Sequence, residues 1–320
     1  MKIYFYCPIA KEPIGAFKEM YKHVLTLKEL GYDAYIIHNK KHKEAWFDNP
    51  ITPIVCPANK LKELIKKNDI LVILEVSTWL LKLVECKRIV IFNQAPYHTF
   101  YDWGLKENKK HHLRDNRIIA IITVSKNAKE YIEYANFKIP IYRIHYYADN
   151  KIFYFIDYSE KYNWISLMTR RNHDDIEQVL QLLYSRSEIN YINEYKIKFI
   201  EKAPENVTAQ LMQKSKFFLH FGYQEGFGIP VLEAMMCGCV VIGYSGFGGE
   251  ELYDRKFNCK IDTLNVVNFA KKIEEMLKVD VNTPSVIEKM GKKASIFASE
   301  NYSRLKYKSE IKRIWKRITH

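Results

Sequence analysis

Residues 216–244 read KFFLHFGYQEGFGIPVLEAMMCGCVVIGY, and this stretch decides the fold. Its first apolar run is typical of a buried strand, and a glycine-rich loop and a short apolar helix follow it. Pro230 falls in the first helical turn, where no amide donor is needed, and Gly238 stands where a left-handed helix cap is expected. The stretch therefore predicts a strand, a loop, a helix and a second strand.

The rest of the chain alternates in the same way between short apolar runs and amphipathic helices. KIYFY, DILVILEV and RIIAIITVS are runs of this kind in the first half, and NWISLMT opens a second series. Such runs, separated by helices, predict parallel sheets that are covered on both faces. We expect two doubly wound α/β domains, residues 1–148 and 149–300, and a basic helix over residues 301–320.

The composition limits the class of protein. The 320 residues are 48% hydrophobic, and the formal net charge is +13. No apolar run reaches the roughly 20 residues that a membrane span needs, and the amino terminus does not resemble a signal peptide. Six scattered cysteines predict buried thiols in a reducing cytoplasm. The positive charge fits either a lysine-rich surface or an anionic partner, such as a membrane, a phosphate-bearing substrate or nucleic acid.

Two glutamates in the deciding stretch are candidates for a binding site. Glu225 lies in the loop at the carboxyl end of the strand, and Glu233 lies about one turn into the helix, so both can address one crevice. Gly226 and Gly228 let backbone amides approach a ligand closely, and the helix dipole favours a phosphate or a polyol. Taken alone, Glu233 also fits an ordinary first-turn glutamate.

The segment EGFGIPVLEAMMCGCVVIGY resembles the E-x7-E signature of retaining glycosyltransferases of the GT-B fold, of the family 4 type. SLMTRRNHDD resembles the phosphate-binding strand end of a branch of that family. The resemblance is strong from about residue 164 to 280 and only architectural before that. It implies two Rossmann-like domains with the active site in the cleft between them, and a closing helix, 301–320, that crosses back toward the first domain.

The resemblance assigns roles to the deciding stretch. Glu233 is expected to accept hydrogen bonds from the ribose hydroxyls of a nucleotide diphosphate sugar. Glu225 is expected to contact the donor sugar near its reacting face. The backbone of Gly226, Phe227 and Gly228 is expected to hold the sugar hydroxyls or the distal phosphate.

The resemblance also implies fixed cations that neutralise the leaving diphosphate, and Arg170 and Arg171 match this role. The family usually places an arginine and a lysine about five residues apart, whereas this chain has Asp175 and Ile176 at the second place. The arginine pair must then do both jobs, or Lys202 helps. A solvated strand end is the alternative explanation for the arginines.

Other candidates are weaker. Gly15, in EPIGAFKEM, matches a position where the family binds donor phosphate or acceptor through the backbone. His98, in FNQAPYHTFYDW, is the expected polar contact from the first domain to the donor sugar, although a loop histidine without a role fits equally well. A second glycine cluster either lines the same crevice or is kept small for packing: Gly246, Gly248 and Gly249.

Several other functions are less compatible with the sequence. A glycoside hydrolase also uses two carboxylates, but it does not require anion-binding features beside them. No Asp-x-Asp pair is present, which favours stabilisation of the leaving group without a metal. No His/Cys cluster has zinc spacing, and the first strand is not followed by the GxGxxG of an NAD-binding oxidoreductase.

We therefore expect a cytoplasmic, retaining glycosyltransferase without metal or cofactor, which moves a hexosyl group from a nucleotide diphosphate sugar to a hydroxyl. The expected acceptor is a surface glycan, a polysaccharide, a glycolipid or a lipid-linked sugar. The alternatives are a DNA-base glucosyltransferase of the same fold and a non-catalytic nucleotide-sugar-binding protein. The last helix sets an apolar stripe against a basic face that can attract the inner face of an anionic membrane; the stripe comprises Leu305, Ile311, Ile314, Trp315 and Ile318.

Overall fold

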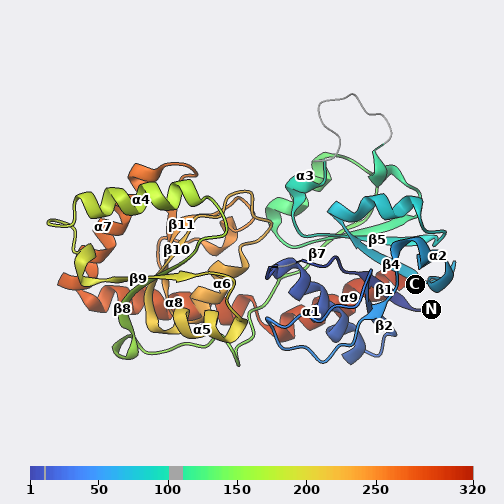
Figure 1. Ribbon diagram of the computed structural model, residues 1–320, viewed down its shortest axis with the longest axis horizontal. Helices are drawn as coiled ribbons and strands as arrows, with labels where there is room; N and C mark the ends of the chain where they lie inside the picture. Colours follow the sequence, from blue (N-terminus) through green and yellow to red (C-terminus); the bar gives the residue numbers. More distant parts are fainter. Residues whose placement is uncertain (11, 101–110, 320) are drawn as a thin grey trace. The chain divides into compact units, whose positions relative to one another are not determined.

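The structure is a computed structural model that describes residues 1–10, 12–100 and 111–319. The chain divides into two units, each with its own parallel sheet (Figure 1). Unit 1 comprises Met1–Tyr146 together with Leu305–His320, and unit 2 comprises Tyr147–Arg304. The last helix of the chain thus belongs to the first unit.

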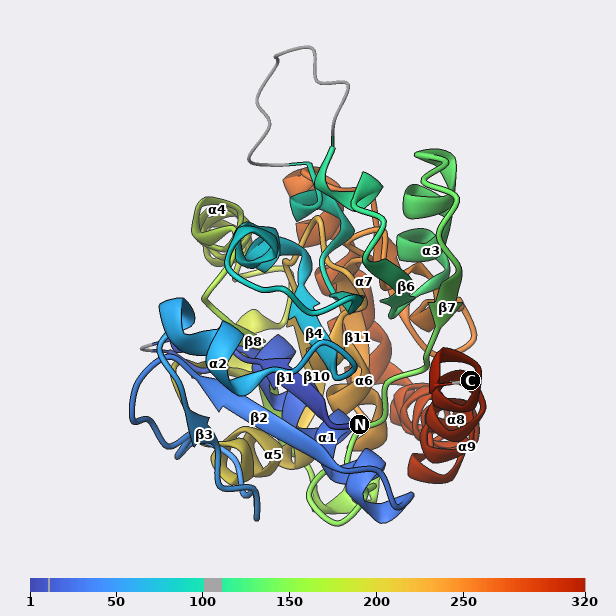
Figure 2. The ribbon, with the colours of Figure 1, turned by 90° about the vertical axis from the view of Figure 1, so that its right-hand side faces the viewer.

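Unit 1 is built on seven parallel strands in the order β3-β2-β1-β4-β5-β6-β7. Figure 2 shows the neighbouring strands β2, β1 and β4 of this sheet. The central strands are continuous apolar runs that are buried throughout, as expected for a parallel sheet with both faces covered. The strands are β1 Ile3–Tyr6, β2 Ala34–His38, β3 Ile54–Val55, β4 Ile70–Leu74, β5 Arg88–Asn93, β6 Ile118–Thr123 and β7 Ile141–Arg143.

The α-helices of unit 1 are α1 Gly15–Glu29, α2 Leu61–Leu64, α3 Lys126–Tyr134 and α9 Arg304–Thr319. Three short 3-10 segments that matter below are η2 Glu75–Lys82, η3 Pro96–His98 and η5 His112–Arg114. Gly31 follows α1 with a φ of +86°, in the left-handed region that glycine adopts readily at the end of a helix.

Helix α9 completes the core of unit 1 and lies beside α1 (Figure 1). The indole nitrogen of the fully buried Trp315 donates a hydrogen bond to Nε2 of the buried His23 in α1, at 2.7 Å. Glu310 accepts from the backbone amide of His145 at 2.8 Å. The predicted apolar stripe is wrong in one member, since Leu305 is 82% exposed, whereas the stripe is otherwise buried and gains Tyr307.

Unit 2 contains a five-stranded parallel sheet in the order β12-β11-β10-β8-β9. Its core is formed by the inner faces of these strands and of the helices packed on them. The strands are β8 Tyr162–Met168, β9 Lys196–Ile200, β10 Ser215–His220, β11 Val240–Tyr244 and β12 Cys259–Ile261. The helices are α4 His173–Ser185, α5 Glu205–Lys214, α6 Ile229–Met236, α7 Val266–Asn282 and α8 Pro284–Asn301.

In the part of the chain that the structure describes, no helix combines the length and the apolar character that crossing a membrane requires.

Candidate functional site

The two glutamates of the deciding stretch lie at the carboxyl edge of the unit 2 sheet. Strand β10 ends at His220, a loop follows, and Gly228 caps α6 with a φ of +89°. Pro230 is in the first turn of α6, and Gly238 follows the helix with a φ of +77°, as predicted. Glu233 lies one turn into α6 and is only 5% exposed.

Glu225 is held in this loop by its backbone and its side chain. Its amide donates to the carbonyl of Gly246 at 2.8 Å, and its carbonyl accepts from the amide of Gly248 at 3.1 Å. Its carboxylate forms an ion pair with Arg171, with 3.3 Å between Oε1 and Nε. The loop after β10 is therefore joined both to the loop after β11 and to the end of β8.

The second glycine cluster allows this close approach. A Cβ on Gly248 would lie 2.2 Å from the carbonyl oxygen of Gly226, and one on Gly249 would lie 2.9 Å from that of Phe227. Both contacts are with backbone, which no rotamer change can relieve. These contacts support the explanation that the glycines Gly246, Gly248 and Gly249 are kept small for packing. The ring of Phe227 is buried and packs 5.4 Å from the ring of Tyr302, so any ligand contact of this residue falls to its backbone.

The two candidate arginines follow β8. Arg170 is exposed, and the side chain of Arg171 is 37% exposed beside Glu225. Asp175, at the place where the family carries a lysine, is buried and accepts a hydrogen bond from the hydroxyl of Tyr244 at 2.8 Å. That position is therefore used within the core of unit 2. Lys202 is exposed after β9 and has a φ of +45°.

A histidine that the sequence analysis did not select stands beside Glu225. His220 is 6% exposed, its Nδ1 lies 2.7 Å from the carbonyl oxygen of Tyr244, and burial lowers its pKa. A Cβ on Gly222 would lie 2.6 Å from Oε1 of Glu225 and 2.8 Å from Nε2 of His220. The imidazole of His220 and the carboxylate of Glu225 thus both lie close to the position that a side chain on residue 222 would occupy. In the sequence, the feature that marks His220 is its position as the last residue of the strand before the glutamate motif.

The carboxyl edge of the unit 2 sheet also has an unusual backbone. Each of its five strands is followed, within four residues, by a non-glycine residue in the left-handed region. Such conformations cost roughly 1–3 kcal/mol each and cluster at functional sites. The five residues are Asn172, Lys202, Gln224, Phe247 and Leu264.

The unit 1 candidates lie at the carboxyl edge of its own sheet. Gly15 is the first residue of α1, close after β1, and His98 is exposed at the end of η3, which follows β5. Each lies in a different unit from the two glutamates. Their contribution to donor binding stays a prediction.

The turn that carries His98 is fixed by a buried acid. The carboxylate oxygens of Glu75 accept from the backbone amides of Gln94 and Ala95, each at 3.0 Å. Burial raises the pKa of Glu75 to about 7, although these hydrogen bonds oppose the shift. Glu75 therefore positions the turn between β5 and η3.

The same network reaches two other segments of unit 1. The side-chain amide of Gln94 donates to the carbonyl of Ala16, in the first turn of α1, at 2.9 Å. Its oxygen accepts from the hydroxyl of Tyr146, the last residue of unit 1 before the chain enters unit 2. Gln94 thus ties the turn to the start of α1 and to the exit of the chain.

The site in unit 2 has the chemistry of a phosphate and polyol binder. It combines a glycine-rich loop, the amino end of α6, two arginines and two carboxylates of different burial. Among the residues with described positions, no group of three or more His, Cys, Asp or Glu side chains is arranged to hold a metal ion.

The comparisons with known proteins agree with this geometry. A family model described as glycosyl transferases group 1 matches residues 184–294, a range that contains Glu225 and Glu233 and begins after Arg171. A curated relative, the alpha-1,6-glucosyltransferase of Actinobacillus pleuropneumoniae, is 25% identical over 258 residues, which cover 77% of this chain and 73% of the relative.

Solved structures resemble the whole chain. The Anabaena protein HepE in complex with UDP-glucose has a TM-score of 0.68 at 14% identity, covering 99% of this chain and 100% of that one. An alpha-glucosyltransferase in complex with UDP and a 13-mer DNA has a TM-score of 0.65 at 16% identity and covers both chains fully.

A longer structural neighbour is TarM of Staphylococcus aureus, in complex with fondaparinux, alpha-GlcNAc-glycerol and UDP. Its TM-score is 0.63 at 18% identity, and the match covers 82% of this chain but only 58% of TarM. Two parallel-sheet units and these neighbours confirm the predicted fold, and the family match confirms the class of enzyme. The protein is a glycosyltransferase built from two Rossmann-like domains in the GT-B fold.

Proposed function

We propose that the protein transfers a hexosyl group from a nucleotide diphosphate sugar to a hydroxyl of a glycan or lipid-linked sugar, in surface glycan, polysaccharide or glycolipid synthesis. The transfer retains the anomeric configuration and needs no metal ion or cofactor. The observation that carries the proposal is the ion pair between Glu225 and Arg171 beside the helix that bears Glu233, at the carboxyl edge of the unit 2 sheet.

The proposed roles follow from charge and burial. As the bond from the anomeric carbon to the phosphate oxygen breaks, negative charge grows on the diphosphate and positive charge on the sugar ring. Arg170, Arg171 and the amino end of α6 stabilise the diphosphate, and Glu225 faces the ring. Glu233 accepts hydrogen bonds from the ribose, and its burial in a site of low dielectric strengthens them. Lys202 supplies a further cation.

UDP-glucose is the first donor to test. Its glucose is the sugar in the name of the curated relative, and its nucleotide is bound in three structural neighbours. A thermal-shift and hydrolysis screen of nucleotide sugars extends the test, because a ligand that binds the native state raises its stability.

The Glu233→Ala variant tests the donor site directly. We expect a dissociation constant for UDP-glucose about 10- to 150-fold weaker by calorimetry, because a hydrogen bond to a charged group contributes roughly 1.5–3 kcal/mol. Glu177→Ala removes an exposed glutamate from α4 of the same unit and serves as the control. Unchanged affinity in a folded Glu233→Ala protein would remove Glu233 from this role.

A second candidate is glucosylation of a DNA base. A structural neighbour that carries DNA, together with the net charge of +13, favours this acceptor. The expected result is that radiolabelled hexose passes to glycan or lipid-linked acceptors and not to duplex DNA. Transfer to DNA, with binding that weakens steeply as salt rises, would establish the second candidate instead.

We also propose that the enzyme works in the cytoplasm, at the inner face of an anionic membrane. Apart from Leu305, the apolar stripe of α9 is buried in unit 1, and the outer face of the helix exposes Lys312, Arg313, Lys316 and Arg317. Each basic residue near such a surface contributes about 1 kcal/mol. Co-sedimentation at low salt with anionic but not neutral vesicles is expected, and replacing the four residues with glutamine should abolish it. Equal recovery with both vesicles would exclude this location.

A further inference from the structure

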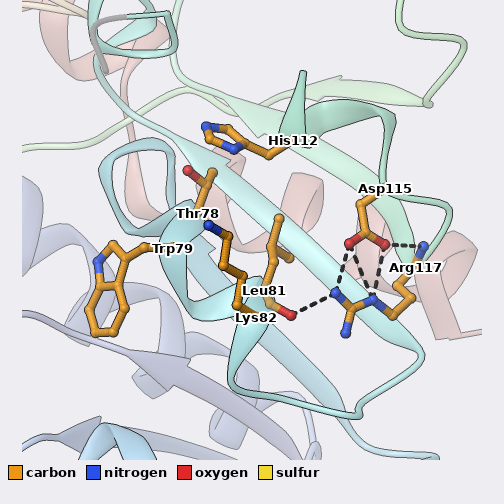
Figure 3. Close-up of a pocket in the computed structure, with 7 residues that line it drawn as sticks. All are labelled: Thr78, Trp79, Leu81, Lys82, His112, Asp115 and Arg117. Carbon is orange, nitrogen blue, oxygen red and sulfur yellow. Dashed lines mark hydrogen bonds and ion pairs between the residues drawn. The ribbon is translucent and has the colours of Figure 1, made fainter. Parts of the chain in front are cut away.

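Unit 1 contains a pocket that the proposed donor site does not use. Its volume is about 430 Å³, and it lies between η2, which follows β4, and the segment that precedes β6 (Figure 3). Pockets of roughly 300–1,000 Å³ bind small ligands, with mostly apolar walls and a few polar groups. The residues that line it belong wholly to unit 1, whereas Glu225 and Glu233 belong to unit 2.

One side of the pocket is fixed by an arginine. The guanidinium of Arg117 donates to the carbonyls of Val84 and Leu81 at 2.6 and 2.7 Å, and to the carboxylate of Asp115 at 2.7 Å. The hydrogen bond from Arg117 lowers the pKa of Asp115, so the pair stays ionised and its charges cancel. Figure 3 shows this pair on the wall of the pocket. Arg117 therefore joins the segments that form this wall, and the wall carries little net charge toward a ligand.

Another side is an exposed aromatic ring. Trp79 is 48% exposed, and its ring meets the buried Tyr6 edge-on, with 6.3 Å between centroids and 89° between planes. The indole is thereby held at the surface. Val76 and Leu83, which flank it on the same segment, are 44% and 37% exposed. An indole presents a broad apolar face together with one N–H donor, which suits a ligand with both apolar and hydroxylated surfaces.

The remaining polar lining is basic and hydroxylic. Lys82 is exposed, His112 is half-buried, and Thr78 contributes a hydroxyl (Figure 3). Since Asp115 is neutralised by Arg117, the pocket has a surplus of positive charge at Lys82. A neutral sugar alone gives no reason for this surplus. A sugar ring that carries a negative group matches both the indole and the ammonium group of Lys82.

We propose that this pocket binds an anionic sugar unit of the acceptor glycan, with its ring against Trp79 and its negative group against Lys82. The inference extends the proposed function, because it assumes a glycan acceptor. The anionic group is a carboxylate of a uronic acid or a phosphate ester on a sugar, and both present the same charge to the pocket. The site would hold part of the acceptor away from the reacting hydroxyl.

The test uses the full chain and three probes: tetragalacturonate, glucose 6-phosphate and a neutral tetraglucoside. Affinities are measured by calorimetry and ligand-observed NMR in the absence of donor. We expect at least one anionic probe to bind at least tenfold more tightly than the neutral one, and the stronger of the two anionic probes identifies the source of the charge. Trp79→Ala and Lys82→Ala should each weaken that binding at least tenfold.

Matched controls are available in the same unit. Tyr134→Ala removes a 94% exposed aromatic side chain from α3, and Lys87→Ala removes an exposed lysine, and neither should change the affinity. Any one of three results overturns the proposal. The neutral probe binds as tightly as the anionic probes, neither anionic probe binds, or Trp79→Ala and Lys82→Ala leave the binding unchanged. Loss of binding to anionic vesicles in Trp79→Ala, without loss of sugar binding, would assign the surface to a membrane and overturn it too.

The same samples separate this proposal from the proposed function. UDP-glucose affinity is measured in every variant, and Trp79→Ala and Lys82→Ala should leave it unchanged. Failure of the native protein to bind any nucleotide sugar would contradict the donor site in unit 2, whereas the sugar probes would still report on the pocket in unit 1.

Discussion

Each unit has its candidate residues at the carboxyl edge of a parallel sheet, but the two edges are built by different means. In unit 2 the loops are shaped by backbone: five left-handed residues and glycines whose missing Cβ atoms let one loop lie against another. In unit 1 the described left-handed non-glycine residues, Asn136 and Lys138, follow α3 instead. The edge of unit 1 is shaped by side chains, with Glu75 and Gln94 at the centre.

The difference suggests a division of labour. A backbone-built edge presents amides that cannot be removed by side-chain substitution and that suit a constant feature, such as the diphosphate of every donor. A side-chain-built edge can change with a few substitutions, which suits an acceptor that differs between related enzymes. The comparison predicts that the two edges respond to different kinds of mutation.

The largest expected effect is that of Gly248→Ala in unit 2. Its Cβ would lie 2.2 Å from a backbone oxygen, so the two loops must separate, and we expect roughly 3–5 kcal/mol of lost stability together with lost UDP-glucose binding. Gly31→Ala is the control, because its φ of +86° is strained for alanine but its Cβ meets nothing within 4 Å. We expect about 1 kcal/mol there, measured by urea unfolding. Equal losses would break the comparison.

Glu75→Gln tests the side-chain edge of unit 1. A glutamine offers one acceptor where two amides now bind, so one buried donor loses its partner at a cost of roughly 1–3 kcal/mol. We expect a lower turnover with unchanged UDP-glucose affinity, and no effect of the exposed Glu63→Gln. Because the pKa of Glu75 is raised from 4.5 to about 7, native stability should fall as pH rises between these values, and the variant should lack that slope. A loss of donor affinity instead would contradict the division of labour.

A third prediction concerns the loss of stability in acid, which is small just below pH 6.5 and accumulates as the pH falls. Burial lowers the pKa of His23 to about 3, whereas the unfolded chain takes up this proton near pH 6.5. The contribution of His23 to stability is therefore full above pH 6.5 and falls by about 1.4 kcal/mol per pH unit below it. His23→Gln keeps an acceptor for the indole N–H of Trp315. In this variant the melting temperature should depend less on pH below pH 6.5 than it does in the native protein. If the variant and the native protein lose stability equally below pH 6.5, His23 is protonated in the native state.

The smallest expected effect is that of chelation. Because arginines and the amino end of α6 are proposed to neutralise the leaving diphosphate, EDTA should leave turnover unchanged. Loss of activity that manganese or magnesium restores would show that the unit 2 edge needs a metal as well as its backbone and cations.

The sequence predicts those parts of the molecule whose signals are local. The strand, loop and helix around Glu225 and Glu233 are confirmed, because apolar runs, Pro230 and Gly238 each act within a few residues. The two sheets follow from the same kind of signal. Short edge strands escape it, as β12 does with only three residues and an exposed lysine at its centre.

Features set by distant contacts could not be read in this way. The segment KLKELIKKN has the pattern of a helix, but α2 spans only Leu61–Leu64. Beyond it, the carboxylate of Asp69 accepts hydrogen bonds from the backbone amides of Lys66 and Lys2, at 2.9 and 2.8 Å. His220 becomes a neighbour of Glu225 only through the packing around Gly222. The network of Glu75 joins segments that are far apart in the chain, and no local pattern marks it.

Because α9 belongs to unit 1, that unit cannot be completed until the end of the chain has been synthesised. The ribosome produces Met1–Tyr146 first, but Trp315 and the rest of α9 emerge only after all of Tyr147–Arg304. Domains generally fold as units during synthesis, so the unit synthesised second can finish first, while the earlier one waits with a groove beside His23 uncovered. A released chain that ends at residue 304 should resist protease in its second half and be digested in its first half.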